Sequence, residues 1–420
     1  AAPTAVPAES AAATSAPAIG EAALQGEISY YTYDLGPANA SREEAIKIFQ
    51  QQHPSAKVNL TVLPYGDLWD KVAAQFAAGQ PPDVIYGDFS LLRYALKGEL
   101  YDMTERVQID PVLTKPDNFT ISMTDPIQAK YGSQKIHALL LGTWVPILYY
   151  NRDIFDAAKV EYPNEEWTWE DLREAAVKLT NRQAETFGFQ FGTTYDNTGW
   201  LWWSHKPSDF WATPQIYPER TIWNSDAGKG VMQIYRDLSV QDKSAITPDE
   251  NSGYDVYAGA FGAGKVAMYA GGDWDAGWSF RDLSFKWGMS FLPKVQSNYR
   301  PSLNTMVASN VIAASTPKPD LAWEFVRFLS TTPEGQTLIG QGAYETPVLK
   351  DAANSKPVMQ PEWAPPGYDV RVRAAQLPGP MYTPYALNLN LWEFPEKFLD
   401  PTVLKVRKGE LSPGALPARP

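Results

Sequence analysis

The residues with the clearest chemical potential lie between Gly259 and Trp274, in the stretch G-A-F-G-A-G-K-V-A-M-Y-A-G-G-D-W. Gly259, Gly264 and Lys265 have the G-x-x-x-x-G-K spacing of a phosphate-binding loop, which holds a nucleotide through backbone N–H groups and the lysine. That loop also needs a Ser or Thr after the lysine to bind Mg²⁺, and here Val266 follows. The spacing alone therefore does not predict a nucleotide site.

A second interpretation fits the same residues better. Gly264 and Lys265 make a turn, residues 266–270 form a short apolar strand, and two glycines then lead to Asp273 and Trp274. An aromatic ring beside a carboxylate at a strand end is typical of a ligand site with an aromatic platform. We therefore expect Lys265 to be an ordinary turn residue, and Asp273 and Trp274 to face a ligand.

Other catalytic patterns are missing from the sequence. The three histidines, at positions 53, 137 and 205, form no H-E-x-x-H pattern, and neither G-x-S-x-G nor D-x-D-x-D-G occurs. The chain contains no cysteine, which excludes disulfides, thiol catalysis and zinc sites built from cysteine. We expect no cofactor and no bound metal.

Composition narrows the class of partner. The chain has 420 residues, a formal net charge of −12 and a pI near 4.9, so nucleic acid and anionic membranes are not expected partners. The longest apolar run, 136–150, is too short for a membrane helix and contains Gly142 and Pro146.

The first 26 residues are almost all small or polar. Such a segment cannot bury enough apolar surface to fold, so residues 1–26 are expected to be a flexible tether. They lack the basic start and apolar centre of a signal peptide. We expect an extracytoplasmic protein, periplasmic or cell-surface, anchored by lipid through a removed N-terminal segment. A cloning remnant or an ordinary disordered tail is the alternative.

Strands and helices alternate from residue 27 onward. The strands are expected at 28–33, 57–63 and 83–88, and the helices at 40–53, 66–79 and 90–97. This order predicts an α/β fold with a mainly parallel sheet covered on both faces. Ligands bind beyond the carboxyl ends of such strands, which here carry Tyr33, Asp34, Tyr65 and Asp88.

The middle of the chain gives further local signals. Thr168 and Asp171 have the spacing of a helix-capping box. Residues 139–142 and 146–150 are expected to be two strands joined by a kink. More helices are expected near 227–238 and 321–329, and an aromatic loop occupies 198–203.

Five stretches together carry a family resemblance. They are F-A-A-G-Q-P-P-D-V-I-Y (76–86), W-V-P-I-L-Y-Y-N-R-D-I-F (144–155), W-T-W-E-D-L-R-E-A-A-V-K-L-T (167–180), F-G-A-G-K-V-A-M-Y-A-G-G-D-W (261–274) and S-N-V-I-A-A-S-T-P-K-P-D-L-A-W-E-F-V-R-F-L (309–329). With these in order, the chain resembles the carbohydrate-binding extracellular solute-binding proteins of ABC importers, a group that includes the maltose- and glycerol-phosphate-binding proteins.

The resemblance implies the two-lobed type II periplasmic-binding-protein fold, in which each lobe is a mainly parallel sheet with flanking helices. The N-terminal lobe would contain 27–143 and 305–346, and the C-terminal lobe 144–304 and 347–420. Three hinge segments would cross near 142–144, 301–304 and 345–348. The implied function is a non-catalytic, monomeric receptor that closes on a mono- or oligosaccharide and delivers it to a membrane permease.

The resemblance also implies site residues. Trp274 matches the family's tryptophan that stacks on sugar, Asp273 stands where the family often has a proline, and Asp34 stands where it holds a hydroxyl. The full predicted ligand-binding set is Tyr33, Asp34, Tyr65, Asp88, Trp144, Trp200, Asp273, Trp274 and Asn304. Trp202 and Trp203 compete with Trp200 for its place.

Purely structural roles are the alternative for several of these residues. Trp274 could be a core residue, Asp34 an exposed turn residue and Asp88 a helix cap. Two other functions also stay open. A cationic solute such as a polyamine would suit acidic residues at the site, and a glycoside hydrolase would need a carboxylate pair that the sequence does not single out.

Overall fold

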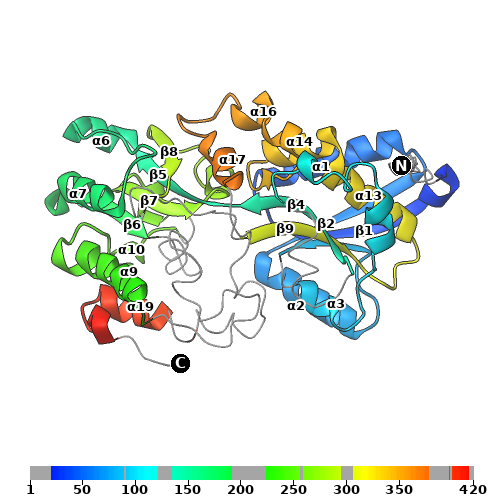
Figure 1. Ribbon diagram of the computed structural model, residues 1–420, viewed down its shortest axis with the longest axis horizontal. Coiled ribbons are helices and arrows are strands. Elements are labelled where there is room, and N and C mark those ends of the chain that lie inside the picture. The colour runs from blue at the N-terminus through cyan, green and yellow to red at the C-terminus, as the bar shows by residue number, and fades with distance from the viewer. Residues whose placement is uncertain are drawn as a thin grey trace, which may run out of the picture.

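The structure is a computed structural model that describes residues 20–88, 91–121, 135–191, 224–255, 259–294, 306–377, 397 and 400–415. Its ribbon forms two lobes, each built on its own sheet, with strands β4 (Ala138–Trp144) and β9 (Met306–Ile312) in the middle (Figure 1). Within these ranges, no helix is long and apolar enough to cross a membrane.

The first lobe is a six-stranded sheet in the order β10–β4–β9–β3–β1–β2. Its other strands are β1 (Gly26–Tyr33), β2 (Ala56–Leu63), β3 (Val84–Gly87) and β10 (Thr346–Pro347). The helices of this lobe are η1 (Glu21–Leu24), α1 (Ala38–Gln52), α2 (Tyr65–Ala77), α3 (Leu92–Ala95), α4 (Thr104–Ile109), η3 (Pro116–Asn118), α13 (Pro319–Thr331), α14 (Pro333–Gln341), α15 (Lys350–Ala353) and α16 (Lys356–Met359).

The second lobe is a four-stranded sheet in the order β6–β7–β5–β8. Its strands are β5 (Pro146–Asn151), β6 (Phe187–Phe191), β7 (Val266–Gly272) and β8 (Trp287–Phe291). The surrounding helices are α6 (Arg152–Ala158), α7 (Trp169–Leu179), η4 (Arg182–Ala184), α9 (Asp226–Arg236), the π-helix η6 (Asp237–Gln241), α10 (Pro248–Asn251), α11 (Gly259–Gly262), α12 (Asp275–Trp278), α17 (Val370–Ala375), α19 (Asp400–Arg407) and η8 (Pro413–Ala415).

Local sequence explains where several helices begin and end. Helix α2 buries Leu68 and Val72, one turn apart on its inner face, and Gly79 follows it with a φ of +70°, a conformation that glycine adopts without strain. Helix α7 begins with the predicted capping box, because the Thr168 side chain accepts from the Asp171 N–H and the Asp171 carboxylate accepts from the Thr168 N–H. The helix predicted at 66–79 and the capping box predicted at Thr168 and Asp171 are both present.

The stretch that resembled a phosphate-binding loop folds as the second interpretation predicts. The short helix α11 ends before Gly264, whose φ is +72°, and strand β7 starts at Val266 with all its residues buried. A phosphate-binding loop would instead continue into a helix after Lys265. The nucleotide interpretation is therefore excluded by the local fold.

The prediction that each sheet is mainly parallel is wrong. Strand β1 pairs parallel with β2 and β3, but β9 lies antiparallel between β3 and β4, and in the second sheet only β6–β7 is parallel. The physical reason is the hinge. The chain leaves the first lobe along β4 and returns to it along β9, so these neighbouring strands must run in opposite directions.

The structure also bears on the places where the chain passes between lobes. The first passage is at Val145, between β4 and β5. The passage predicted at 301–304 lies outside the described residues. Helices α15 and α16 pack on α14 of the first lobe, whereas Trp363 packs with the second lobe's core, its ring centroid 5.0 Å from that of Tyr368. We propose that the third passage lies between Met359 and Trp363, beyond the predicted position.

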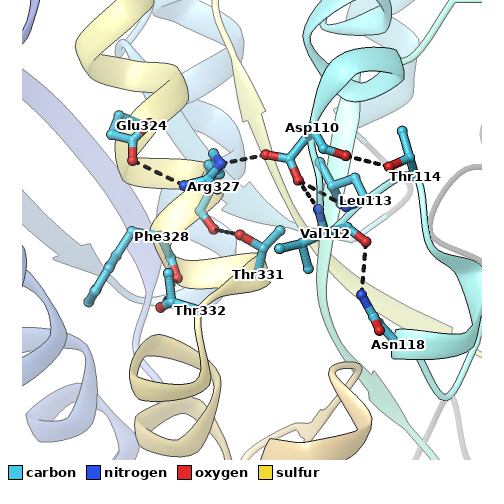
Figure 2. Close-up of polar contacts among 10 residues, drawn as sticks. All are labelled: Asp110, Val112, Leu113, Thr114, Asn118, Glu324, Arg327, Phe328, Thr331 and Thr332. Atoms are coloured by element: carbon cyan, nitrogen blue, oxygen red, sulfur yellow. Dashed lines mark hydrogen bonds and ion pairs between the residues drawn. The ribbon is translucent and has the colours of Figure 1, made fainter. Parts of the chain in front are cut away.

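The turn that follows α4 is fastened to α13 by one buried carboxylate (Figure 2). Asp110 Oδ1 accepts from the N–H groups of Val112 and Leu113 at 2.8 and 2.9 Å, and Oδ2 accepts from Arg327 Nε at 2.5 Å. Arg327 also pairs with Glu324 on its own helix. Asp110 thus ties the turn after α4 to helix α13 of the first lobe.

Candidate functional site

An aromatic group forms at the carboxyl ends of β1 and β2. The Tyr33 ring is 3% exposed, and its centroid lies 5.0 Å from that of Tyr65, 5.3 Å from that of Tyr86 and 6.4 Å from that of Trp69. Tyr65 begins α2 and is 44% exposed. The buried ring of Tyr33 therefore supports the ring of Tyr65, whose exposed part is the surface that a ligand could cover.

Acidic side chains lie beside these rings. The Tyr65 hydroxyl donates to Asp88 Oδ2 at 3.4 Å, and Asp88, directly after β3, is half-buried. Asp34 is exposed, and its Oδ1 accepts from the Gly36 N–H at 2.8 Å and from Asn39 Nδ2 at 2.7 Å. Asp34 thus closes the turn after β1, whereas Asp88 sits where its carboxylate can meet both Tyr65 and a solute hydroxyl.

A line of rings joins the lobes. The Tyr344 centroid lies 6.2 Å from that of Tyr33 and 6.2 Å from that of Trp144, and the Trp144 centroid lies 6.3 Å from that of Trp274. Trp274 is half-buried and packs against the cores of both lobes. We call these four residues together with Tyr65 the ring chain. It begins on the first lobe and ends on the second.

The glycine pair before Asp273 allows Trp274 to take this position. A Cβ placed on Gly272 would lie 2.3 Å from the Trp274 ring, so the ring folds back against a backbone that has no side chain. The Tyr149 hydroxyl donates to the Gly272 carbonyl at 2.7 Å from the neighbouring strand β5. This hydrogen bond fixes the end of β7, and the Trp274 ring packs directly on the fixed backbone.

Asp273 itself points away from the ring chain into the junction of the lobes. It is 0% exposed; Oδ1 accepts from the Val145 N–H at 3.0 Å and Oδ2 from Thr346 Oγ1 at 2.7 Å, with Arg371 Nη2 at 3.4 Å. Burial raises the pKa of Asp273 to about 6, although the Arg371 charge and these hydrogen bonds act in the opposite direction. These contacts give Asp273 a structural role at the junction.

Comparison with known proteins identifies the family. Residues 44–365, more than half of the chain, match the family described as bacterial extracellular solute-binding protein. The chain belongs to this family. Members bind solutes, and the family places the protein outside the cytoplasm.

Two relatives from Bacillus subtilis (strain 168) resemble this solute-binding protein over most of their length. The galactooligosaccharide-binding protein is 23% identical over 339 residues, covering 77% of this chain and 73% of the relative. The arabinooligosaccharide-binding protein is 24% identical over 342 residues, covering 79% and 75%.

Solved structures confirm the two-lobed fold. The ABC substrate-binding protein from Listeria monocytogenes in complex with cycloalternan has a TM-score of 0.73 at 23% identity, covering 93% of this chain and 95% of that one. Maltose-bound MalE3 from T. maritima has a TM-score of 0.67 at 17% identity, covering 92% and 96%.

The arginines near the ring chain of this solute-binding protein are buried in ion pairs. Arg42 Nη2 lies 2.5 Å from Glu345 Oε1, with side chains 2% and 1% exposed, and the Tyr86 hydroxyl donates to the same oxygen. Arg371 pairs with Asp273, and both are 0% exposed. Neither arginine presents its charge to a solute that packs on the ring chain.

A second buried acid, Asp275, directly follows Trp274 in the sequence. Asp275 is 3% exposed, and its Oδ2 accepts from the Tyr269 hydroxyl at 3.0 Å. Burial raises the pKa of Asp275 to about 8, with the nearby Asp273 carboxylate adding to the shift. Asp275 is therefore mostly protonated at neutral pH.

The structure brings only some of the predicted site residues together. It brings Tyr33, Tyr65, Asp88, Trp144 and Trp274 to the ring chain or its edge, and it puts Asp34 in a turn and Asp273 in the junction. Trp200, Trp202, Trp203 and Asn304 lie outside the described residues.

Three aromatic residues of this region were missed by sequence reasoning. Trp69 lies one turn after Tyr65 on α2, with ring centroids 5.8 Å apart, so helical spacing could have found it. Trp278 lies 5.7 Å, centroid to centroid, from Tyr344. Nothing in the sequence near Tyr344 signals its position, because its ring partners come from distant segments.

Proposed function

We propose that this protein captures an uncharged mono- or oligosaccharide between its lobes and delivers it, chemically unchanged, to the permease of an ABC importer. The observation that carries the proposal is the ring chain, whose members come from both lobes and end beside the Tyr65–Asp88 pair. A solute seated there would contact both lobes at once, which is what favours a closed arrangement.

The residue types suit a sugar. Pyranose rings have apolar C–H faces that pack on aromatic rings and hydroxyl rims that need acceptors and donors. Packing on one or two rings would bury roughly 200 Å² of apolar surface, which contributes about 5 kcal/mol before ordering costs. Hydrogen bonds at the rim would bring the affinity to roughly micromolar, about 8 kcal/mol.

The charges favour an uncharged solute. An anionic solute needs converging cations, and Arg42 and Arg371 are buried and paired. A cationic solute would need several carboxylates facing it. The acids described beside the ring chain are the half-buried Asp88, bonded to Tyr65, and Asp34, whose Oδ1 closes the turn after β1. The relatives named for galacto- and arabinooligosaccharides support the same choice.

The proposal includes the surroundings of the protein. The small and polar residues before Gly20 would act as a spacer between a lipid anchor and the folded lobes. The predicted boundary at residue 26 is too late, because Leu24 of η1 is buried in the first lobe's core and β1 begins at Gly26. The protein would work as a monomer without cofactor or metal. Release from membranes by a lipase or detergent, compared with a salt wash, tests the anchor.

The experiment that tests the function is a thermal-shift panel on the full chain. The panel contains maltotetraose, galactotetraose, arabinotetraose, spermidine and p-nitrophenyl glycosides. We expect a rise in the melting temperature with at least one neutral oligosaccharide and no turnover of the glycosides. A shift with spermidine alone would reassign the protein to cationic solutes. Release of p-nitrophenol that a carboxylate variant abolishes would replace the proposal with a glycoside hydrolase.

A further inference from the structure

Four groups meet at one buried point between the lobes. The Asp273 carboxylate accepts from the Val145 N–H and from Thr346 Oγ1, and the Asp273 N–H donates to the Val145 carbonyl at 2.9 Å. Arg371 Nε donates to Thr346 Oγ1 at 3.2 Å, and its Nη1 donates to the Tyr368 hydroxyl at 2.5 Å. We call Val145, Thr346, Asp273 and Arg371 the interlobe pin.

The members of the interlobe pin come from both lobes. Asp273 follows β7 of the second sheet, and Thr346 belongs to β10, the edge strand of the first sheet. Val145 is the passage from β4 to β5. Arg371 lies on α17, which packs against β8 of the second sheet and β10 of the first. One carboxylate thus joins a passage between the lobes to a strand of each.

Separating the groups of the interlobe pin would cost much free energy. Asp273, Thr346 and Arg371 are fully buried, so no water replaces a partner that moves away. Leaving a buried charge without its partners is among the most costly local changes in a protein. Groups that sit close to a rotation axis barely change their separations during the rotation, whereas distant groups change theirs greatly. A buried charge network between moving bodies is therefore best tolerated on the axis.

We propose that the interlobe pin is the pivot about which the two lobes rotate, and that Asp273 is a positioning residue for the adjacent Trp274. Trp274 follows Asp273 directly and contacts Trp144, so the pin fixes the platform of the second lobe against the ring chain. This second role rests on the proposed sugar function, whereas the pivot does not. The pin restricts the lobes to one path of motion.

The test measures the distribution of distances between the lobes in the full chain without solute. The chain has no cysteine, so Ala74→Cys on α2 and Lys229→Cys on α9, both exposed and on opposite lobes, give two clean spin-label sites (Figure 1). Pulsed electron resonance is compared in this background and with Asp273→Asn, Thr346→Val and Asp275→Asn. Asp275→Asn is the matched control, because Asp275 is a buried acid two residues away that is bonded to Tyr269 instead of the pin.

We expect the distance distribution to become about twofold wider with Asp273→Asn and with Thr346→Val, and to keep its width with Asp275→Asn. If Asp273→Asn does not fold, the nearly isosteric Thr346→Val decides alone. Wild-type widths in the folded pin variants, or equal broadening in the control, would overturn the pivot.

A second readout concerns Trp274. In titrations with maltotetraose, Asp273→Asn should weaken binding about tenfold, the cost of a displaced platform contact, while Asp275→Asn leaves it unchanged. Unchanged binding in Asp273→Asn would remove the positioning role. If maltotetraose fails to bind the wild-type protein, the sugar proposal is weakened, and the distance measurement still decides the pivot.

Discussion

Replacing Tyr65 by alanine should separate binding from stability more cleanly than any other change in the ring chain. Tyr65 is 44% exposed, while its support Tyr33 is 3% exposed. An aromatic side chain offers roughly 200 Å² of surface, so about 90 Å² of Tyr65 is open to a solute. At about 25 cal/mol per Å², covering that area contributes about 2 kcal/mol, or about thirtyfold in affinity.

The cost of the same substitution to folding should be small. The ring of Tyr65 makes edge contacts with Tyr33 and Trp69, each worth about 0.5–1 kcal/mol, and its hydroxyl bond to Asp88 is long at 3.4 Å. We therefore expect Tyr65→Ala to lower the free energy of unfolding by about 1–2 kcal/mol.

Calorimetric titration with the oligosaccharide that gives the largest thermal shift measures the affinity, and urea unfolding measures stability. Tyr65→Phe is the matched control, because it keeps the ring and removes only the weak hydroxyl bond. Its affinity should fall only a fewfold. The reasoning is refuted if Tyr65→Ala binds as tightly as the wild type, or if it loses more than about 4 kcal/mol of stability, which would make Tyr65 a core residue.

Three further predictions follow from buried groups. Arg42→Met leaves the Glu345 carboxylate buried without its cation and should cost about 3–5 kcal/mol in urea unfolding, most of it regained in Arg42→Met/Glu345→Leu; additive losses would contradict this. The raised pKa of Asp275 means that the folded state keeps the carboxyl proton up to about pH 8, whereas the unfolded state loses it near pH 4. The contribution of this proton to stability is therefore fully present below about pH 4 and is lost as the pH rises through 8. Asp275→Asn should therefore flatten the fall in melting temperature between pH 5 and 8, and an unchanged slope would refute it. Gly272→Ala should displace the Trp274 ring and weaken sugar binding about tenfold while the circular dichroism spectrum stays that of the wild type, and unchanged affinity would show that the ring is not a platform.

Local features of the fold were predictable because their causes lie within a few residues. The capping box of Thr168 and Asp171 needs only the right two side chains three positions apart. Strand β7 is apolar throughout and ends at two glycines, so its position could be read directly. The nearness of Tyr33, Tyr65 and Asp88 to one another was predictable because these residues lie at or just after the carboxyl ends of predicted strands.

The role of Asp273 could not be predicted from the sequence. Its proximity to Trp274 suggested a ligand acceptor. However, its Oδ2 accepts from Thr346, 73 positions later, and Arg371, 98 positions later, and its Oδ1 accepts from the Val145 N–H. The direction of β9 was missed for a related reason. Strand pairing across a hinge depends on where a distant segment returns, and no local pattern records that.

Three consecutive residues show how the ring chain and the interlobe pin are connected. Tyr344 and Glu345 lie in the bend that leads into β10, and Thr346 begins that strand. Tyr344 and Thr346 each contact a residue of the second lobe, whereas Glu345 pairs within the first lobe. Tyr344 contacts Trp144 and Trp278, Thr346 bonds Asp273, and Glu345 pairs with Arg42.

This arrangement has a mechanical consequence. Glu345 is fixed in the first lobe by a buried charge, so the backbone of this segment cannot shift without breaking that pair. A solute that packs on the ring chain therefore cannot displace Tyr344 by sliding this segment. The remaining freedom is rotation of the second lobe about the bonds of Thr346, which is the motion that the interlobe pin permits. Binding at the rings and movement at the pivot are thus coupled through the short segment from Tyr344 to Thr346.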